Sequence, residues 1–343
     1  VTASTSPGSK NNSGPTDYPM TTQTSWHPTA SVEVLRLRAG MLARTRAFFE
    51  RRQVMEVETP VLSAAGTTDV NIHSLSTRVA GQPGSLYLHT SPEFPMKRLL
   101  AAGSGDIYQI ARVFRDGESG RRHNPEFTML EYYRLGMDHH RLMDEVQELM
   151  GELLGDGAEP LQCQRLTYRE AFMQAVGLDP MVAGRQDLLD ALARHQVELP
   201  GEPLTDAQLS DLLMGTLVSP GLGRDQPCFV YDFPEDQAAL ARIRPGNPPV
   251  AERFELFYRG MELANGFHEL CDADEQRQRF ARDNLVRQES GLPTVPADEN
   301  MLQALEQGLP ACAGVAIGFD RLVMLAAGAD QLSDVLAFAI MRA

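Results

Sequence analysis

The stretch GVAIGFDRL at residues 314–322 joins an apolar run to a charged pair, Asp320 and Arg321, through Gly318. A glycine there lets the backbone approach a bound ligand closely, although an ordinary turn from a strand into a helix would use it as well. Two earlier segments also set charges in apolar surroundings: VETP at residues 57–60, and residues 113–127, which contain FRDG and RHNPEF. These three segments are the candidates for chemistry in this chain.

The rest of the chain predicts an α+β fold around these segments. Apolar residues at helical spacing predict a helix over residues 32–49. Strands are predicted at residues 54–57, 85–89, 107–114, 127–133, 228–233, 254–258 and 261–270. They do not alternate regularly with crossover helices, so the pattern favours an antiparallel sheet flanked by helices over a doubly wound parallel sheet.

The domain organisation follows from two changes in composition. Residues 1–30 are rich in Ser, Thr, Pro, Asn and Gly, which predicts a disordered leader before a single domain over residues 31–343. Between about residues 161 and 226 the pattern turns helical, with capping boxes that start at Thr167 and Thr205. This predicts a helical insertion between two halves of the sheet.

Charge and motif content exclude several classes of protein. A net charge of −15 argues against a broadly basic surface that binds phosphate backbones, although a local basic patch stays open. No apolar stretch reaches the ~18 residues of a membrane span, so we expect a cytoplasmic protein. The four cysteines form no C-x-x-C pair, which argues against a zinc site built from such pairs. Neither a P-loop nor a G-x-G-x-x-G turn occurs, so ATP would have to be bound by other residues.

The three segments, with TSPE at residues 90–93, RHNPEFT at 122–128 and ELANGF at 262–267, resemble the signature motifs of class II aminoacyl-tRNA synthetases. They are most similar to the lysyl branch, and within it to the lysyl-tRNA synthetase paralogues that modify elongation factor P. The resemblance runs from about residue 25 to the C-terminus. It implies a class II catalytic domain, an ATP-dependent ligase with a lysyl-adenylate intermediate, Mg²⁺, and a homodimer formed through the first motif with Pro60.

Adenylate formation needs phosphate charge to be neutralised and the attack on the α-phosphate to be aligned, which planar guanidinium groups do well. The resemblance implies that Arg115 holds the α-phosphate and Arg321 the γ-phosphate, as the catalytic pair. It also implies that His123 contacts a phosphate and that Phe127 stacks on adenine. The remaining implied ATP contacts are Asp116, Gly117, Asn124, Glu262, Leu263 and Gly318.

Three glutamates, Glu255, Glu262 and Glu269, are spaced by seven residues, which cannot place all of them on one face of a single strand. They must lie on neighbouring strands of a hairpin that turns near Arg259 and Gly260. By resemblance, Glu255 and Glu262 coordinate Mg²⁺, as hard carboxylate oxygens can. The alternative is that the glutamates are solvent-facing charges at sheet edges.

A desolvated lysine ammonium needs a carboxylate partner. The resemblance implies that Glu269, with the Tyr133 hydroxyl, binds the ε-ammonium of lysine, and that Glu93 binds the α-amino group. Asn265 would hold the carboxylate or the amine, and Glu131 points the same way as Tyr133 if both lie on a strand. The other implied substrate contacts are Ser91, Pro92 and Ala316.

Three departures from the lysyl-tRNA synthetase pattern bear on the acceptor and the substrate. No OB-fold anticodon domain precedes the first motif, so we expect elongation factor P rather than tRNA as acceptor. Ala316 stands where tRNA-charging relatives have glycine, which implies a preference for (R)-β-lysine over lysine or is neutral. The second motif has Asp116-Gly117 in place of Asn-Glu, and a shifted loop register would bring Glu118 to the expected position.

Two alternatives stay open from the sequence. An enzyme of the same fold that activates aspartate or asparagine would need a cationic partner for the side chain, whereas the proposed pocket ends in Glu269. A non-catalytic paralogue that senses an amino acid or binds a protein is favoured by Gly117 and disfavoured by Arg115, Arg321 and the two metal glutamates.

Overall fold

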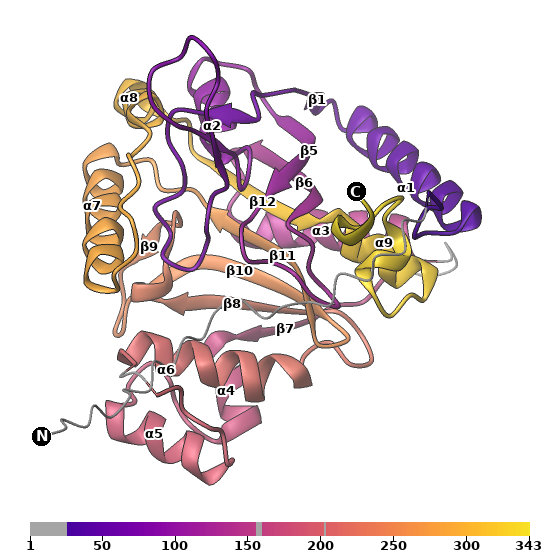
Figure 1. Cartoon of the computed structure of the whole chain (residues 1–343). Helices are drawn as coiled ribbons and strands as arrows, with labels where there is room; N and C mark the ends of the chain where they lie inside the picture. The colour runs from indigo at the N-terminus through magenta and orange to yellow at the C-terminus, as the bar shows by residue number, and fades with distance from the viewer. Residues whose placement is uncertain (1–25, 156–159, 202–203) are drawn as a thin grey trace, which may run out of the picture.

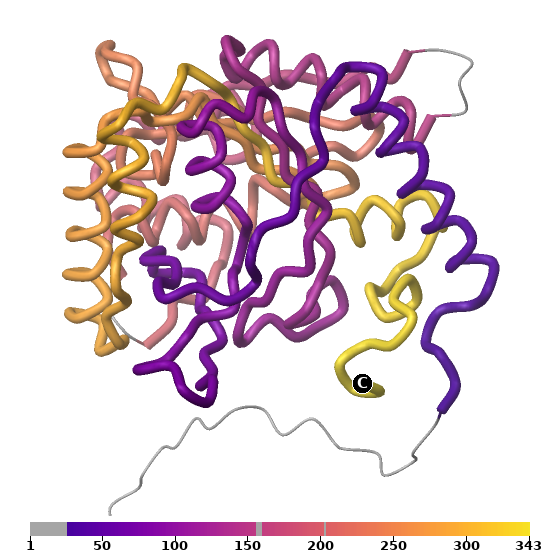
Figure 2. Tube along the Cα trace, turned by 90° about the horizontal axis from the view of Figure 1, so that it is seen from above, coloured from indigo at the N-terminus to yellow at the C-terminus, as the bar shows by residue number. Residues whose placement is uncertain are grey.

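The computed structural model describes residues 26–155, 160–201 and 204–343 (Figure 1). Most of the predicted leader therefore lies outside the described residues. Its last residues pair with the other end of the chain, since the Thr29 amide donates to the Ala337 carbonyl at 2.8 Å and the Ala30 amide to the Leu336 carbonyl at 3.1 Å. Figure 2 shows this neighbourhood of the first helix and the C-terminus.

A large mixed sheet forms the centre of the molecule, with strand order β1-β5-β6-β12-β11-β10-β8-β7. The pairs from β5 to β8 are antiparallel, while β1 and β7 add parallel edges, so the predicted α+β class is confirmed. The strands of this path are β1 Met55–Glu56, β5 Ile107–Phe114, β6 Glu126–Leu135, β12 Cys312–Gly318, β11 Met261–His268, β10 Val250–Tyr258, β8 Cys228–Pro234 and β7 Gln164–Thr167.

Three short strands form a separate sheet in the order β2-β4-β3. They are β2 Leu62–Ser63, β4 Leu86–Leu88 and β3 Ser76–Thr77. A further short strand, β9 Ile243–Arg244, pairs with β10.

Helices α1 Val32–Arg51, α3 His139–Leu154 and α9 Phe319–Ala327 cover one face of the sheet. Their apolar side chains recur at helical spacing, as with Leu142, Val146 and Leu149 of α3, and are fully buried in the main core. No helix among the described residues is long and apolar enough to cross a bilayer. The opposite face of the sheet is the one that carries the predicted site.

The rim of that opposite face is built by α2 Glu93–Ala101, α7 Ala273–Glu289 and α8 Glu299–Gly308, which pack on one another. At the far edge, helices α4 Tyr168–Val176, α5 Arg185–Arg194 and α6 Asp206–Leu213 lie beyond β7 and β8 (Figure 1). The capping boxes at Thr167 and Thr205 are confirmed. The segment predicted as helical contains one strand, β7, because its residues extend the sheet in parallel with β8 before Thr167 caps α4.

The hairpin of β10 and β11 turns where the sequence predicted. Tyr258 pairs with Met261, and the two residues between them, Arg259 and Gly260, have φ of 52° and 63°. Two positive φ values in a two-residue loop are those of a turn whose twist matches the flanking strands. The turn brings Glu255 and Glu262 onto adjacent strands.

Candidate active site

A cleft of about 2410 Å³ opens on the uncovered face of the sheet. It collects nearly all of the site residues predicted from the sequence, and Pro92, Asp116 and Gly117 are the exceptions that do not line it. The predicted residues that line the cleft are Ser91, Glu93, Arg115, His123, Asn124, Phe127, Tyr133, Glu255, Glu262, Leu263, Asn265, Glu269, Ala316, Gly318 and Arg321.

The floor of the cleft is set by strand register. Glu255 of β10 lies opposite Asn265 of β11, Asn265 opposite Ala316 of β12, and Ala316 opposite Glu131 of β6. Residues two apart on a strand share a face, so Arg253, Phe267 and Tyr133 form the next row on the same side. Segments far apart in the sequence are thereby aligned in one plane, with Ala316 at the centre.

One end of the cleft is a buried acidic pocket. Lys97 of α2 is fully buried, and its Nζ lies 2.7 Å from Glu93 Oε1 and 2.6 Å from Glu269 Oε2. Burial alone lowers the pKa of Lys97, but the charges of Glu269 and Glu93 more than offset it and the net shift is upward. Lys97 is therefore a fixed ammonium that neutralises part of the pocket, a role not predicted from the sequence.

A third carboxylate, that of Glu131, completes the acidic pocket. It accepts hydrogen bonds from the hydroxyls of Ser91 and Tyr133, each at 2.7 Å. Burial, with the neighbouring charge of Glu93, raises the pKa of Glu131 to about 8, and burial raises that of Glu269 to about 7. The pocket thus holds three carboxyl groups and one ammonium, an arrangement that favours a ligand with additional positive charge.

The other end of the cleft carries cationic groups. Arg321 donates to the Glu262 carbonyl at 2.7 Å, and its Nη2 lies 2.9 Å from His123 Nε2. Burial and the charge of Arg321 lower the pKa of His123, which favours the neutral imidazole as acceptor of that bond. The Arg115 guanidinium lies over the Phe127 ring at 5.2 Å, and its buried Nε makes no hydrogen bond within the described residues. An arginine with an unused donor suits an anionic ligand.

The loop after β5 has a backbone conformation that accounts for glycine at residue 117. Gly117 has a φ of 77°, a conformation that favours glycine over glutamate. The Asp116 amide donates to the His73 carbonyl at 2.8 Å, and its carboxylate accepts from the Gly117 amide at 2.9 Å. Glu118 lines the cleft instead, with Oε1 3.4 Å from Arg115 Nη1. The carboxylate is displaced along the sequence and still lies beside Arg115.

Two further carboxylates of the cleft, those of Glu255 on β10 and Glu262 on β11, come from neighbouring strands. Burial raises the pKa of Glu255 to about 7; Arg253, which hydrogen-bonds to Glu255, opposes this shift, and Glu262 adds to it. Two hard oxygen ligands from facing strands fit a Mg²⁺ ion shared with phosphate oxygens. Arg253 was not predicted, although its spacing of two residues from Glu255 on a strand was a usable signal.

Gly314→Ala is expected to damage the pocket, because a Cβ at residue 314 would lie 2.3 Å from Tyr133 Cε1 and 2.6 Å from Glu269 Oε1. Overpacking of this kind costs about 1–3 kcal/mol and displaces side chains. The matched control is Gly266→Ala, whose Cβ would meet Phe254 in the core on the opposite face at 2.4 Å. We expect both variants to lower the urea midpoint, and Gly314→Ala alone to lose amino-acid binding in calorimetry. Equal binding by the two variants would contradict this pocket.

Comparison with known proteins gives a consistent result. The family model for tRNA synthetases class II (D, K and N) matches residues 25–342. The chain is 51% identical over 322 residues to the elongation factor P–(R)-beta-lysine ligase of Vibrio parahaemolyticus, covering 92% of this chain and 98% of that protein. It is 50% identical over 331 residues to the ligase of the same name from Yersinia enterocolitica, covering 94% and 100%. The Pectobacterium carotovorum ligase is 49% identical over 330 residues, with the same coverage.

Proposed function

Because this chain belongs to the family of class II tRNA synthetases (D, K and N), we propose that it activates lysine or (R)-β-lysine with ATP and transfers the product to a lysine of elongation factor P. The observation that carries this proposal is the acidic pocket of Glu93, Glu131 and Glu269, in which Lys97 contacts Glu93 and Glu269. A substrate with two ammonium groups supplies the charge that this pocket lacks. Aspartate or asparagine does not, which disfavours the other two substrates of the family.

In the first reaction, the amino acid and ATP lie next to each other along the cleft. The ammonium groups of the substrate lie at Glu93, Glu131 and Glu269, so its carboxylate points along the floor towards Asn265 and Arg115. A carboxylate oxygen attacks the α-phosphorus of ATP, the bond to the bridging oxygen breaks, and pyrophosphate leaves. Arg115 neutralises the α-phosphate and Arg321 the γ-phosphate, while Phe127 stacks on adenine. Mg²⁺ held by Glu255 and Glu262 would neutralise further phosphate charge.

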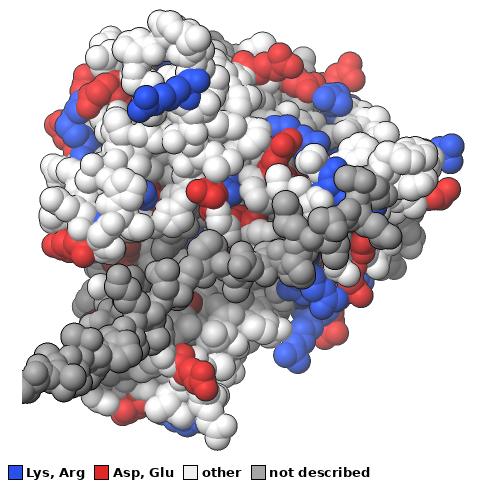
Figure 3. Space-filling view, in the orientation of Figure 1, with Lys and Arg blue, Asp and Glu red and all other residues white. Residues whose placement is uncertain are grey.

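In the second reaction the ε-amine of the acceptor lysine attacks the acyl carbon of the adenylate. A C–N bond forms, AMP leaves with the bonding electrons, and the amine nitrogen loses a proton to solvent or a base. The acceptor in the names of the relatives is elongation factor P, which supports a protein rather than tRNA. Figure 3 shows basic and acidic side chains interspersed on one face, without a broad basic area among the described residues visible there. A homodimer through the first motif and a cytoplasmic location belong to the same proposal.

A non-catalytic paralogue is the second candidate, since the second motif carries Gly117. The placement of Glu118 beside Arg115 weakens it, because the carboxylate lost at residue 117 is supplied one residue later. ATP–pyrophosphate exchange distinguishes the two. Exchange that depends on lysine or β-lysine supports the ligase, and absence of exchange with every amino acid supports the paralogue.

The affinity for lysine is expected to rise about tenfold from pH 6 to pH 8. The pKa values of Glu131 and Glu269, about 8 and about 7, lie above the ordinary carboxyl value of 4.5, so both groups bind protons at pH 6. A diammonium ligand favours the ionised carboxylates, so binding releases protons and strengthens as pH rises. Calorimetry across this pH range measures the affinity for lysine. In the Glu131→Gln variant we expect the affinity to change less steeply with pH. An affinity independent of pH in the unmodified protein would contradict this picture.

A further inference from the structure

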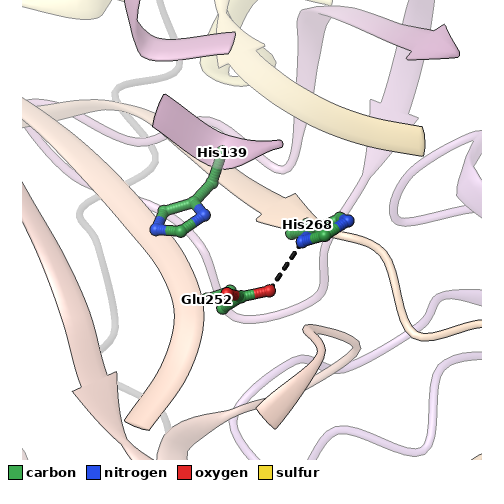
Figure 4. A group of neighbouring side chains, drawn as sticks. All are labelled: His139, Glu252 and His268. Atoms are coloured by element: carbon green, nitrogen blue, oxygen red, sulfur yellow. Dashed lines mark hydrogen bonds and ion pairs between the residues drawn. The ribbon is translucent and has the colours of Figure 1, made fainter. Parts of the chain in front are cut away.

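We propose that His139, Glu252 and His268 form a site for a transition-metal ion of the Zn²⁺ class. Their candidate ligand atoms all lie within 4.8 Å of one another. His139 is the first residue of α3, while Glu252 and His268 come from the paired strands β10 and β11. Figure 4 shows the three side chains close together.

This cluster is separate from the cleft. Arg253 and Phe267 pair across β10 and β11 and line the cleft, so their neighbours Glu252 and His268 point to the opposite face. That face is covered by α3, which supplies His139. None of the three residues lines the cleft. The proposed ion therefore has no part in adenylate formation.

The observation that points to a ligand is the state of His139. Its side chain is 1% exposed, yet neither ring nitrogen makes a hydrogen bond within the described residues. Nε2 lies 3.6 Å from Oδ1 of Asp232, beyond hydrogen-bond length, and that oxygen also makes no hydrogen bond there. Buried polar atoms of this kind are rare without a bound ion or water. A metal ion held with Glu252 and His268 would provide a partner for a ring nitrogen of His139.

The donor set selects the metal. Two imidazoles and a carboxylate suit Zn²⁺ and its neighbours, whereas Mg²⁺ prefers oxygen ligands alone. Asp232 lies beside this group, with Oδ1 3.6 Å from His139 Nε2. Arg244 lies 2.5 Å from Asp232 Oδ2 and 3.4 Å from Glu252 Oε1, which orients both carboxylates as an outer shell. Two carboxylates and one guanidinium leave one net negative charge to balance a divalent ion.

Binding must break one hydrogen bond, because His268 Nδ1 and Glu252 Oε2 are 2.6 Å apart. Zn²⁺ bonded to both would separate the two atoms to about 3.3 Å, the spacing of two tetrahedral ligands. A neutral imidazole that binds the ion through Nδ1 carries its proton on Nε2, so the pair can bind the ion without releasing a proton. Because the ion joins the start of α3 to β10 and β11, it is expected to stabilise the fold.

The test uses the full chain, freed of any histidine tag, treated with chelator and then loaded with Zn²⁺ in excess Mg²⁺. The excess Mg²⁺ occupies the carboxylates of the cleft, so that bound Zn²⁺ reports the new site. We expect about one Zn²⁺ per chain by elemental analysis and a rise in Tm of about 5 °C at Zn²⁺ well above Kd. His139→Gln and His268→Gln should each lower the affinity for Zn²⁺ at least about tenfold. His195→Gln, at the exposed end of α5, is the matched control and should bind as the unmodified protein does.

Two outcomes overturn the proposal: an unmodified chain that binds no Zn²⁺, or one whose Zn²⁺ affinity is unchanged by His139→Gln. A second measurement does not rely on variants that fold poorly. The unmodified protein is loaded with Co²⁺ and its visible absorption recorded, where a tetrahedral nitrogen and oxygen site gives intense bands and an octahedral one gives weak bands. Weak bands alone would also overturn the site.

Discussion

Lys97→Met is expected to destabilise the protein by about 3–5 kcal/mol, because it removes the buried ammonium that pairs with Glu93 and Glu269 and leaves their charge uncompensated. Lys97 and Glu269 each have side chains that are 1% exposed, so water cannot replace the lost partner. Urea unfolding measures the effect as a lower midpoint.

The control for this variant is Arg98→Met on the same helix. Arg98 is exposed, and its loss should change stability by less than about 0.5 kcal/mol. A double variant, Lys97→Met with Glu269→Gln, removes charge from both sides and should recover part of the loss. A Lys97→Met protein as stable as the Arg98→Met protein would show that Lys97 does not neutralise the pocket.

Arg115→Ala is expected to slow ATP–pyrophosphate exchange by about 10²–10³-fold, because the phosphate that gains charge in the transition state loses a positioned donor. Arg115 lines the cleft and lies over Phe127, and its buried Nε has no hydrogen-bond partner among the described residues, although Nη1 contacts Glu118 at 3.4 Å. Arg115→Lys keeps the charge but not the planar fork, and we expect it to restore only part of the rate.

Arg121→Ala is the matched control for Arg115→Ala. Arg121 belongs to the same loop region, its side chain is 65% exposed, and it does not line the cleft. Its exchange rate should equal that of the unmodified protein, and the thermal midpoints of all three variants should agree closely. A loss of less than tenfold in Arg115→Ala would remove Arg115 from the phosphate site.

The parts of the structure that the sequence predicts are those with a local signal. The strand predicted at residues 127–133 lies within β6, and the capping boxes at Thr167 and Thr205 mark two helix starts that the structure confirms. The hairpin turn at Arg259 and Gly260 was inferred because three glutamates seven residues apart cannot share one strand. The lack of regular crossover helices favoured the antiparallel sheet, and the motif resemblance named most of the residues that line the cleft.

The parts that the sequence does not predict depend on contacts between distant segments. Glu93 and Lys97 are four residues apart on a helix, which is a local signal for an ion pair. The second partner, Glu269, comes from another part of the chain and is brought there by the sheet. The cluster of His139, Glu252 and His268 has the same origin, since its members share no motif. The short strand β7 escaped prediction because it is an edge strand next to three helices.

The measurement that tests the central claim most directly is transfer of labelled lysine, with Mg²⁺ and ATP, to purified elongation factor P and to total tRNA in parallel reactions. We predict that elongation factor P is labelled and that tRNA is not. We also predict faster transfer with (R)-β-lysine than with lysine. Label on tRNA alone would contradict the proposed acceptor. Label on neither, with no pyrophosphate exchange, would contradict the proposed ligase and favour the sensing paralogue.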